Sequence, residues 1–106
     1  MIVSYESVEL RECCLQLAVA ERLLGSVRAQ ALIALIADIE ALENASELAD
    51  IHHVDALPDM TDLILIDIGA NSVVRLVPVG RKFKRNDENT PLWATVRRLK
   101  IVGIDQ

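Results

Sequence analysis

Apolar residues recur every three or four positions in two stretches of the first half of the chain, at residues 7–24 and 27–42. This spacing places them on one face of an α-helix. Gly25 and Ser26 separate the two stretches, and these residue types often end one helix and cap the next. The pattern therefore predicts two helices that fold back on each other as an antiparallel hairpin, whose shared apolar face needs a third surface to cover it.

Residues rich in Val and Ile dominate the second half of the chain and predict strands. Residues 63–68 and 73–79 flank a turn-rich segment, so together they predict a β-hairpin. Residues 95–104 alternate polar and apolar positions, which predicts a half-buried strand. In this strand, Arg98 and Lys100 are expected on one face, and Gly103 is expected with the buried residues on the other.

The whole pattern predicts one α+β domain over residues 1–106: a short N-terminal strand, an antiparallel two-helix hairpin and a three-stranded antiparallel sheet. Residues 2–5 supply the first strand or lead directly into the first helix. Loops are predicted at residues 52–62 and 81–91. The chain of 106 residues has about the length of one average domain.

Composition narrows the class of protein. The chain is 52% hydrophobic, but it holds no apolar run of the ~18–20 residues that cross a bilayer. Its first residues lack the basic-then-apolar pattern of a signal peptide. Cys13 and Cys14 are adjacent in a predicted helix, so they cannot readily form a disulfide with each other. We therefore expect a cytoplasmic protein with free thiols and no membrane segment.

Charge is divided unevenly along the chain. Residues 1–68 carry thirteen acidic and three basic side chains, whereas residues 69–106 carry three acidic and eight basic ones, which gives −10 and +5. Such asymmetry can mark a surface for an anionic partner. It fits equally well two halves that attract each other or solvate their own surfaces. The net charge of −5 also differs from that of most tight phosphate binders.

A few residues could carry chemistry. Arg75, inside a predicted strand, could hold a phosphate through bidentate hydrogen bonds, or it could form a cross-strand ion pair with Asp67. His52 and His53 are the only imidazoles, so an acid–base role near neutral pH would fall to them, with His53 as the catalytic candidate. The alternative is that both are partly exposed loop residues. No third metal ligand and no glycine-rich phosphate loop accompany them, so we expect neither a metal nor a cofactor.

The charged segment at residues 81–85 interleaves basic side chains with one aromatic side chain, as nucleic-acid-binding loops do. Its basic residues are Arg81, Lys82, Lys84 and Arg85. A solvated loop that only links two strands would have the same composition. Trp93, further along, is predicted to close one end of the core rather than to stack on a base.

The order of the predicted elements resembles the architecture of the RelE/ParE toxin superfamily, and in particular its HigB-like members. Residues 1–5 (MIVSY) resemble the M-I-x-S-F opening of those proteins, and residues 42–50 (LENASELAD) resemble the A-x-x-L-x-D-L run that ends their second helix. Arg75 stands about where the group has an arginine within a sheet strand. Residues 93–105 resemble the closing strand of the group, with its W-x-x-V motif and near-terminal aspartate.

This resemblance implies a toxin of a bacterial toxin–antitoxin system, either a ribosome-dependent mRNA endoribonuclease or another inhibitor of translation. Arg75 and His53 would then serve in catalysis. The implied RNA-binding residues are Arg81, Lys82, Lys84, Arg85, Arg98 and Lys100. The implied partners are mRNA on the ribosome and an antitoxin protein of the helix-turn-helix type, which would cover the apolar and basic groove of the toxin.

The chain also departs from the family pattern. Residues 55–62 (DALPDMTD) carry acids where the family usually has a basic H-x-L-K-G-x-R segment, and Asp105-Gln106 stand where members often have a terminal Tyr-His. RNA cleavage needs groups that move protons and cations that neutralise the phosphate. The alternative is therefore a RelE-fold binding module or homodimer without nuclease activity. Residues 73–79 are apolar on both faces, so we expect a partner or a second copy to cover one of them.

Overall fold

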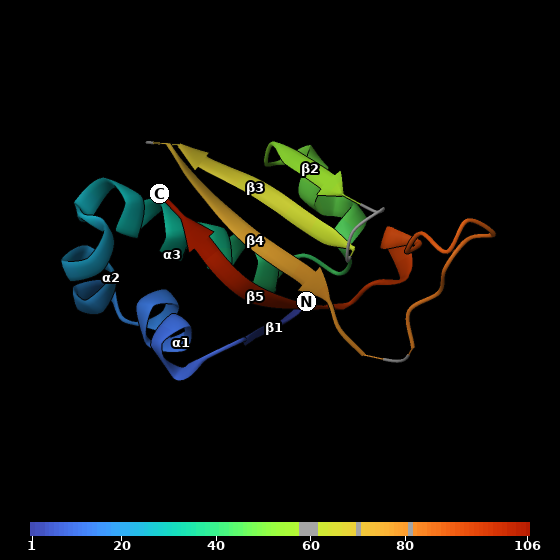
Figure 1. Ribbon diagram of the computed structural model, residues 1–106, viewed down its shortest axis with the longest axis horizontal. Coiled ribbons are helices and arrows are strands. Elements are labelled where there is room, and N and C mark those ends of the chain that lie inside the picture. Colours follow the sequence, from blue (N-terminus) through green and yellow to red (C-terminus); the bar gives the residue numbers. More distant parts are fainter. Residues whose placement is uncertain (58–61, 70, 81) are drawn as a thin grey trace.

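A layer of helices packs against one face of a five-stranded sheet, and the described helices leave the other face open (Figure 1). The computed structural model describes residues 1–57, 62–69, 71–80 and 82–106, with only the backbone at residues 56 and 57. Within these residues, no helix is both long and apolar enough to span a membrane. In chain order the elements are β1 (Ile2–Tyr5), α1 (Val8–Leu15), α2 (Leu17–Leu24), α3 (Ser26–Ala41), the 3₁₀-helix η1 (Ala45–Asp50), β2 (Val54–Leu57), β3 (Leu63–Gly69), β4 (Ser72–Pro78), the 3₁₀-helix η2 (Trp93–Thr95) and β5 (Arg98–Asp105).

The sheet is mixed, with the strand order β1-β5-β4-β3-β2. The pairs β3–β4 and β4–β5 are antiparallel, as the sequence predicts, but β1 runs parallel to β5. The α+β class is therefore confirmed, whereas the prediction of a three-stranded, wholly antiparallel sheet is wrong. The N-terminal strand joins the sheet by pairing with the last strand of the chain, and local hydrophobic periodicity carries no information about so distant a partner.

Strand β2 lies within a segment that the sequence predicts to be a loop, so that prediction is wrong over these residues. It pairs antiparallel with β3, with Val54 opposite Ile66 and Asp55 opposite Leu65. Because Asp and Ala are depleted in strands, the sequence of β2 gives little sign of its structure. The strand forms because β3 presents an edge of unpaired backbone groups to the chain that precedes it.

The predicted helix over residues 7–24 is two helices in the structure, so the predicted two-helix hairpin becomes an arrangement of three. Ser7 caps α1, and its Oγ accepts a hydrogen bond from the backbone N–H of Leu10 at 3.2 Å. Gln16 is extended, with φ −123° and ψ 111°, and it separates α1 from α2. The sequence does not indicate this break, because neither Pro nor Gly, which commonly interrupt helices, occurs there. The second predicted helix is confirmed by α3, against which α2 packs after a turn at Gly25.

The core lies between α3 and the sheet. Leu32, Leu35 and Ile39 of α3 are fully buried. The sheet contributes an equally buried set, consisting of Ile66, Val74, Leu76, Leu99 and Ile101. Because successive strand residues point to opposite faces, Leu65 and Arg75 lie on the other side of the sheet, which we call the open face. Trp93 packs against the core, as the sequence predicts.

One irregularity decides which residues reach the open face. Arg75 pairs with Gly103 and Leu76 pairs with Ile101, so Val102 is an extra residue in β5. Such a β-bulge shifts the alternation of faces by one position, and directly paired residues share a face. Gly103 therefore lies beside Arg75 on the open face, and the prediction that it shares the buried face of β5 is wrong.

Candidate nucleic-acid interface

Arg75 occupies the centre of the open face, because β4 is the middle strand of the sheet. Its guanidinium lies over Gly103: a Cβ atom at residue 103 would come within 2.0 Å of Arg75 Nη2 and 2.6 Å of its Cζ. The Nε atom of Arg75 lies 3.1 Å from Asp105 Oδ2. The structure thus replaces the ion pair considered with Asp67 by one with Asp105. The carboxylate of Asp67 instead accepts a hydrogen bond from the backbone N–H of Gly69 at 2.7 Å.

The Arg75 guanidinium keeps capacity for a ligand. Its Nε is buried and close to Asp105, but the N–H makes no well-directed hydrogen bond to any described residue. The side chain as a whole remains 39% exposed. A phosphate above the open face can therefore reach the guanidinium, where it would compete with the carboxylate of Asp105.

His53, the second predicted catalytic residue, stands just before β2 at the edge of the sheet. Its Nε2 lies 3.7 Å from Asp55 Oδ2, and its side chain is 76% exposed. Asp55, Leu65 and Arg75 form one row across three strands. Because neighbouring strands are ~4.8 Å apart, the backbones of β2 and β4 are separated by about 10 Å. The structure therefore does not bring His53 and Arg75 together.

His52 makes a structural contact instead. Its Nε2 lies 3.0 Å from Oδ2 of Asp38 on α3, and its side chain is only 20% exposed. This contact ties the segment between η1 and β2 to the helical layer. Of the two histidines, only His53 presents its ring to solvent.

Arg85 is held by its neighbours. Its two terminal nitrogens donate to the two carboxylate oxygens of Asp62, at 2.7 and 3.1 Å, and one of them also donates to the carbonyl oxygen of Asn89 at 2.9 Å. The guanidinium stacks on the ring of Phe83, 5.0 Å from its centroid. These contacts favour a role for Arg85 in ordering the loop rather than in contacting RNA.

The other predicted RNA-binding residues divide by whether an acid neutralises them. Lys100 is paired, because its Nζ lies 2.8 Å from Glu6 Oε2. Arg81 lies outside the described residues. Three of the predicted residues have no acidic partner within the described parts of the chain: Lys82, Lys84 and Arg98.

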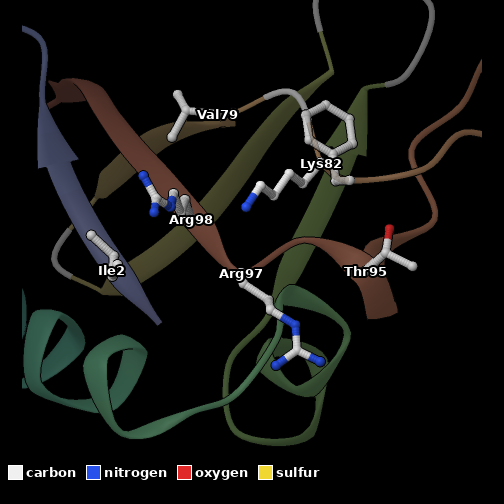
Figure 2. A pocket seen from close by; sticks show the side chains of 8 residues that line it. Ile2, Val79, Lys82, Thr95, Arg97 and Arg98 are labelled. Carbon is white, nitrogen blue, oxygen red and sulfur yellow. The ribbon is translucent and has the colours of Figure 1, made fainter.

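Lys82 and Arg98 line a pocket of about 410 Å³ where β1 and β5 begin and β4 has just ended (Figure 2). The other residues that line it are Ile2, Val79, Gly80, Phe83, Thr95 and Arg97. Backbone hydrogen bonds join its walls, since Ile2 N donates to Arg97 O and Val79 N donates to Arg98 O, both at 3.1 Å. Three separate segments of the chain thus form one basic, partly apolar pocket.

Arg97 belongs to this pocket but was not among the residues selected from the sequence. Like Lys82 and Arg98, it has no acidic partner in the described parts of the chain. The sequence feature that could have identified Arg97 is the pair of adjacent arginines, Arg97-Arg98. The position of Arg97 just before β5, in the same pocket as Lys82, is known only from the fold.

Comparisons with known proteins place this chain in no family. The chain matches no family model, no curated protein and no solved structure. In the described part of the chain, no three His, Cys, Asp or Glu side chains gather as the ligands of a metal ion do. The chemistry that the arrangement offers is the binding of anions, by Arg75 on the open face and by the cations of the pocket.

Proposed function

We propose that the chain is a RelE/ParE-like, toxin-type protein that binds RNA and slows translation through that binding. The observation that carries this proposal is a group of three cations around one pocket, Lys82, Arg97 and Arg98, none of which pairs with an acid among the described residues. A protein with a net charge of −5 that concentrates unneutralised cations at one place has a defined anion-binding surface. The order strand, helices, strands also supports the proposal.

Binding is favoured over cleavage by the positions of Arg75 and His53. General acid–base catalysis requires the acid or base within hydrogen-bond reach of the reacting atoms, about 3 Å or one water away. A phosphate on Arg75 would be separated from His53 by the whole of β3. Each of the two residues also has a carboxylate beside it, Asp105 and Asp55 respectively. An mRNA endoribonuclease therefore remains the second candidate, supported by the resemblance rather than by this geometry.

The partner implied by the resemblance is an antitoxin, and the open face is where we propose that it docks. Leu65, Val73 and Val77 are half-buried there, next to Arg75. A helix or strand of a partner that covers them would bury apolar surface and remove Arg75 from RNA. The alternative occupant is a second copy of this chain, which would make the protein a homodimeric binding module.

The first test is RNA binding by the purified protein. A fluorescein-labelled single-stranded oligoribonucleotide should bind, and the affinity should fall with salt, because each neutralised phosphate contributes ~0.7 to the slope of log K against log salt. Lys82→Ala and Arg98→Ala should each reduce that slope by about 0.7. Arg22→Ala, on α2 at the far end of the molecule, is the matched control. An unbound oligonucleotide at low salt would exclude the proposal.

The second test separates inhibition by binding from cleavage. Induced expression should slow growth and protein synthesis without creating new 5′ ends in cellular mRNA. Arg75→Ala should relieve the inhibition and leave the urea midpoint of unfolding near that of the original chain. Rapid growth arrest with new mRNA 5′ ends, both abolished by Arg75→Ala, would instead establish the endoribonuclease.

A further inference from the structure

We propose that the pocket lined by Lys82, Phe83 and Arg98 is a nucleotide site, in which a base stacks on Phe83 while a phosphate lies between Lys82 and Arg98. This inference rests on the proposed function where the nucleotide belongs to an RNA chain, and it stands without it where the nucleotide is free. A base-binding ring would give this surface an affinity for nucleotides beyond the attraction of charge alone.

The phosphate end of the site is formed by two cations from separate segments. Figure 2 shows the amine of Lys82 extending across the pocket toward Arg98, while the guanidinium of Arg97 points away from both. No acidic side chain lines the pocket among the described residues. An anion there would be attracted by two charges that form no ion pair with any described acid, and a guanidinium offers a phosphate two parallel hydrogen bonds.

The base end is the ring of Phe83. Arg85 stacks on this ring at 5.0 Å and is itself fixed by Asp62, yet Arg85 does not line the pocket. Phe83 does line it, and the base would stack on the part of the ring that Arg85 leaves uncovered. Ile2 and Val79 also line the pocket and add apolar surface to it. An aromatic face next to cations is the combination that binds one base and its phosphate.

The size and polarity of the pocket further limit the kind of ligand that it can bind. The volume of about 410 Å³ lies near the lower end of the ~300–1,000 Å³ typical of small-ligand sites, so the pocket suits a single nucleotide. The hydroxyl of Thr95 already donates to Leu92 O and accepts from Lys84 N, at 2.7 and 2.9 Å. The pocket thus offers stacking and charge rather than base-specific hydrogen bonds, which predicts tolerance for different bases.

The test uses AMP, ribose 5-phosphate and adenosine as separate probes, titrated at low salt into the whole protein by calorimetry. AMP should bind at least tenfold more tightly than either fragment. Phe83→Leu should weaken AMP by about tenfold and leave ribose 5-phosphate unchanged, whereas Phe83→Tyr, which keeps an aromatic face, should retain AMP. Lys82→Gln with Arg98→Gln should weaken AMP and ribose 5-phosphate alike, and Arg11→Gln with Arg22→Gln is the control pair.

The outcomes separate this inference from the proposed function. Equal affinity for AMP and ribose 5-phosphate, tighter binding of decanoate than of AMP, or RNA binding with no AMP binding would each overturn the nucleotide site. In the last case, RNA binding by the open face would still stand. AMP binding with the expected responses to substitution, but no binding of an oligoribonucleotide, would support the site for free nucleotides and reject the proposed function. Binding of both, weakened together by Phe83→Leu, would support both.

Discussion

Arg75 lies flat against β5 because the residue beneath it, Gly103, has no side chain. The bulge at Val102 places that glycine on the open face, and Asp105 two residues later supplies the neighbouring charge. The position of the guanidinium therefore depends on a residue that could not itself touch a ligand. Residue 103 is a positioning residue for whatever Arg75 binds.

We predict that Gly103→Ala lowers the free energy of unfolding by about 1–3 kcal/mol, the usual effect of forcing extra atoms into a packed site. The added Cβ would overlap Nη2 of Arg75, at 2.0 Å, so the guanidinium must leave its place. Urea unfolding of Gly103→Ala, Arg75→Ala and the double variant measures the coupling between the two residues. If Gly103→Ala destabilises equally with and without the Arg75 side chain, the proposed contact is wrong.

Cys14 provides a second residue-scale prediction. Burial, with a smaller effect of Cys13, raises the pKa of the Cys14 thiol to about 12. In the unfolded chain this thiol loses its proton near its ordinary pKa of ~8.5. Between these values the folded state binds the extra proton, so the contribution of Cys14 to stability is complete below pH ~8.5 and is lost as the pH rises toward 12. Urea melts at pH 8 and pH 10.5 should show this loss.

The matched variant for that experiment is Cys14→Val, which keeps an apolar side chain and removes the titrating group. Its stability should fall less between the two pH values than that of the original chain. Tyr5, whose pKa is also raised by burial, titrates in the same direction in both proteins. An unchanged difference between pH 8 and pH 10.5 in Cys14→Val would contradict the assignment to Cys14.

At the scale of elements, the hydrophobic pattern predicted the helices and strands whose structure depends only on their own residues. Helix α3 and strand β5 follow from their own periodicity, because each buries one face against the core. Strands β3 and β4 follow from their Val- and Ile-rich composition and the turn between them. Four features could not be predicted in this way: the break at Gln16, the strand β2, the parallel pairing of β1 with β5 and the bulge at Val102. Each depends on backbone conformation or on pairing with another segment, and the side-chain pattern of the segment itself does not record these.

The packing of α3 against the sheet can be tested directly. Leu35 of α3 is fully buried between the helix and the sheet, so Leu35→Ala should lower the free energy of unfolding by ~2–5 kcal/mol. Leu23→Ala is the matched control, since the same side chain on α2 is 53% exposed. It should cost well under 1 kcal/mol as a surface substitution outside the core. Equal urea midpoints for the two variants would show that α3 does not pack as described.

At the scale of the whole molecule, the long axis separates two of the helices from the basic pocket. Helices α1 and α2 lie at one end and the loop that contains Lys82 lies at the other (Figure 1), in a body with extents of 44 × 23 × 23 Å. The sequence alone predicted the uneven charge and most of the cations. It could not predict which of them acids neutralise, because pairs such as Arg85 with Asp62 and Lys100 with Glu6 join residues far apart in the chain.

This separation predicts retention on heparin despite the negative net charge. Two double variants lower the net charge by the same four units: Lys82→Glu with Arg98→Glu, and Arg11→Glu with Arg22→Glu. The first pair should elute from heparin at clearly lower salt than the original chain, because it reverses the charge of the pocket. The second should elute close to it. Similar elution of the two pairs would mean that net charge, rather than a local surface, governs binding.

The parallel pairing of β1 with β5 also constrains how the molecule is made. Ile2 lies opposite Arg98, so the first strand finds its neighbour only when almost the whole chain is present. Contacts of such long sequence separation slow folding, because the loop they close must be ordered first. During synthesis, β1 therefore leaves the ribosome long before its partner, with its backbone edge and apolar side chains uncovered. Until β5 also emerges, the nascent chain is most prone to aggregate and to bind chaperones.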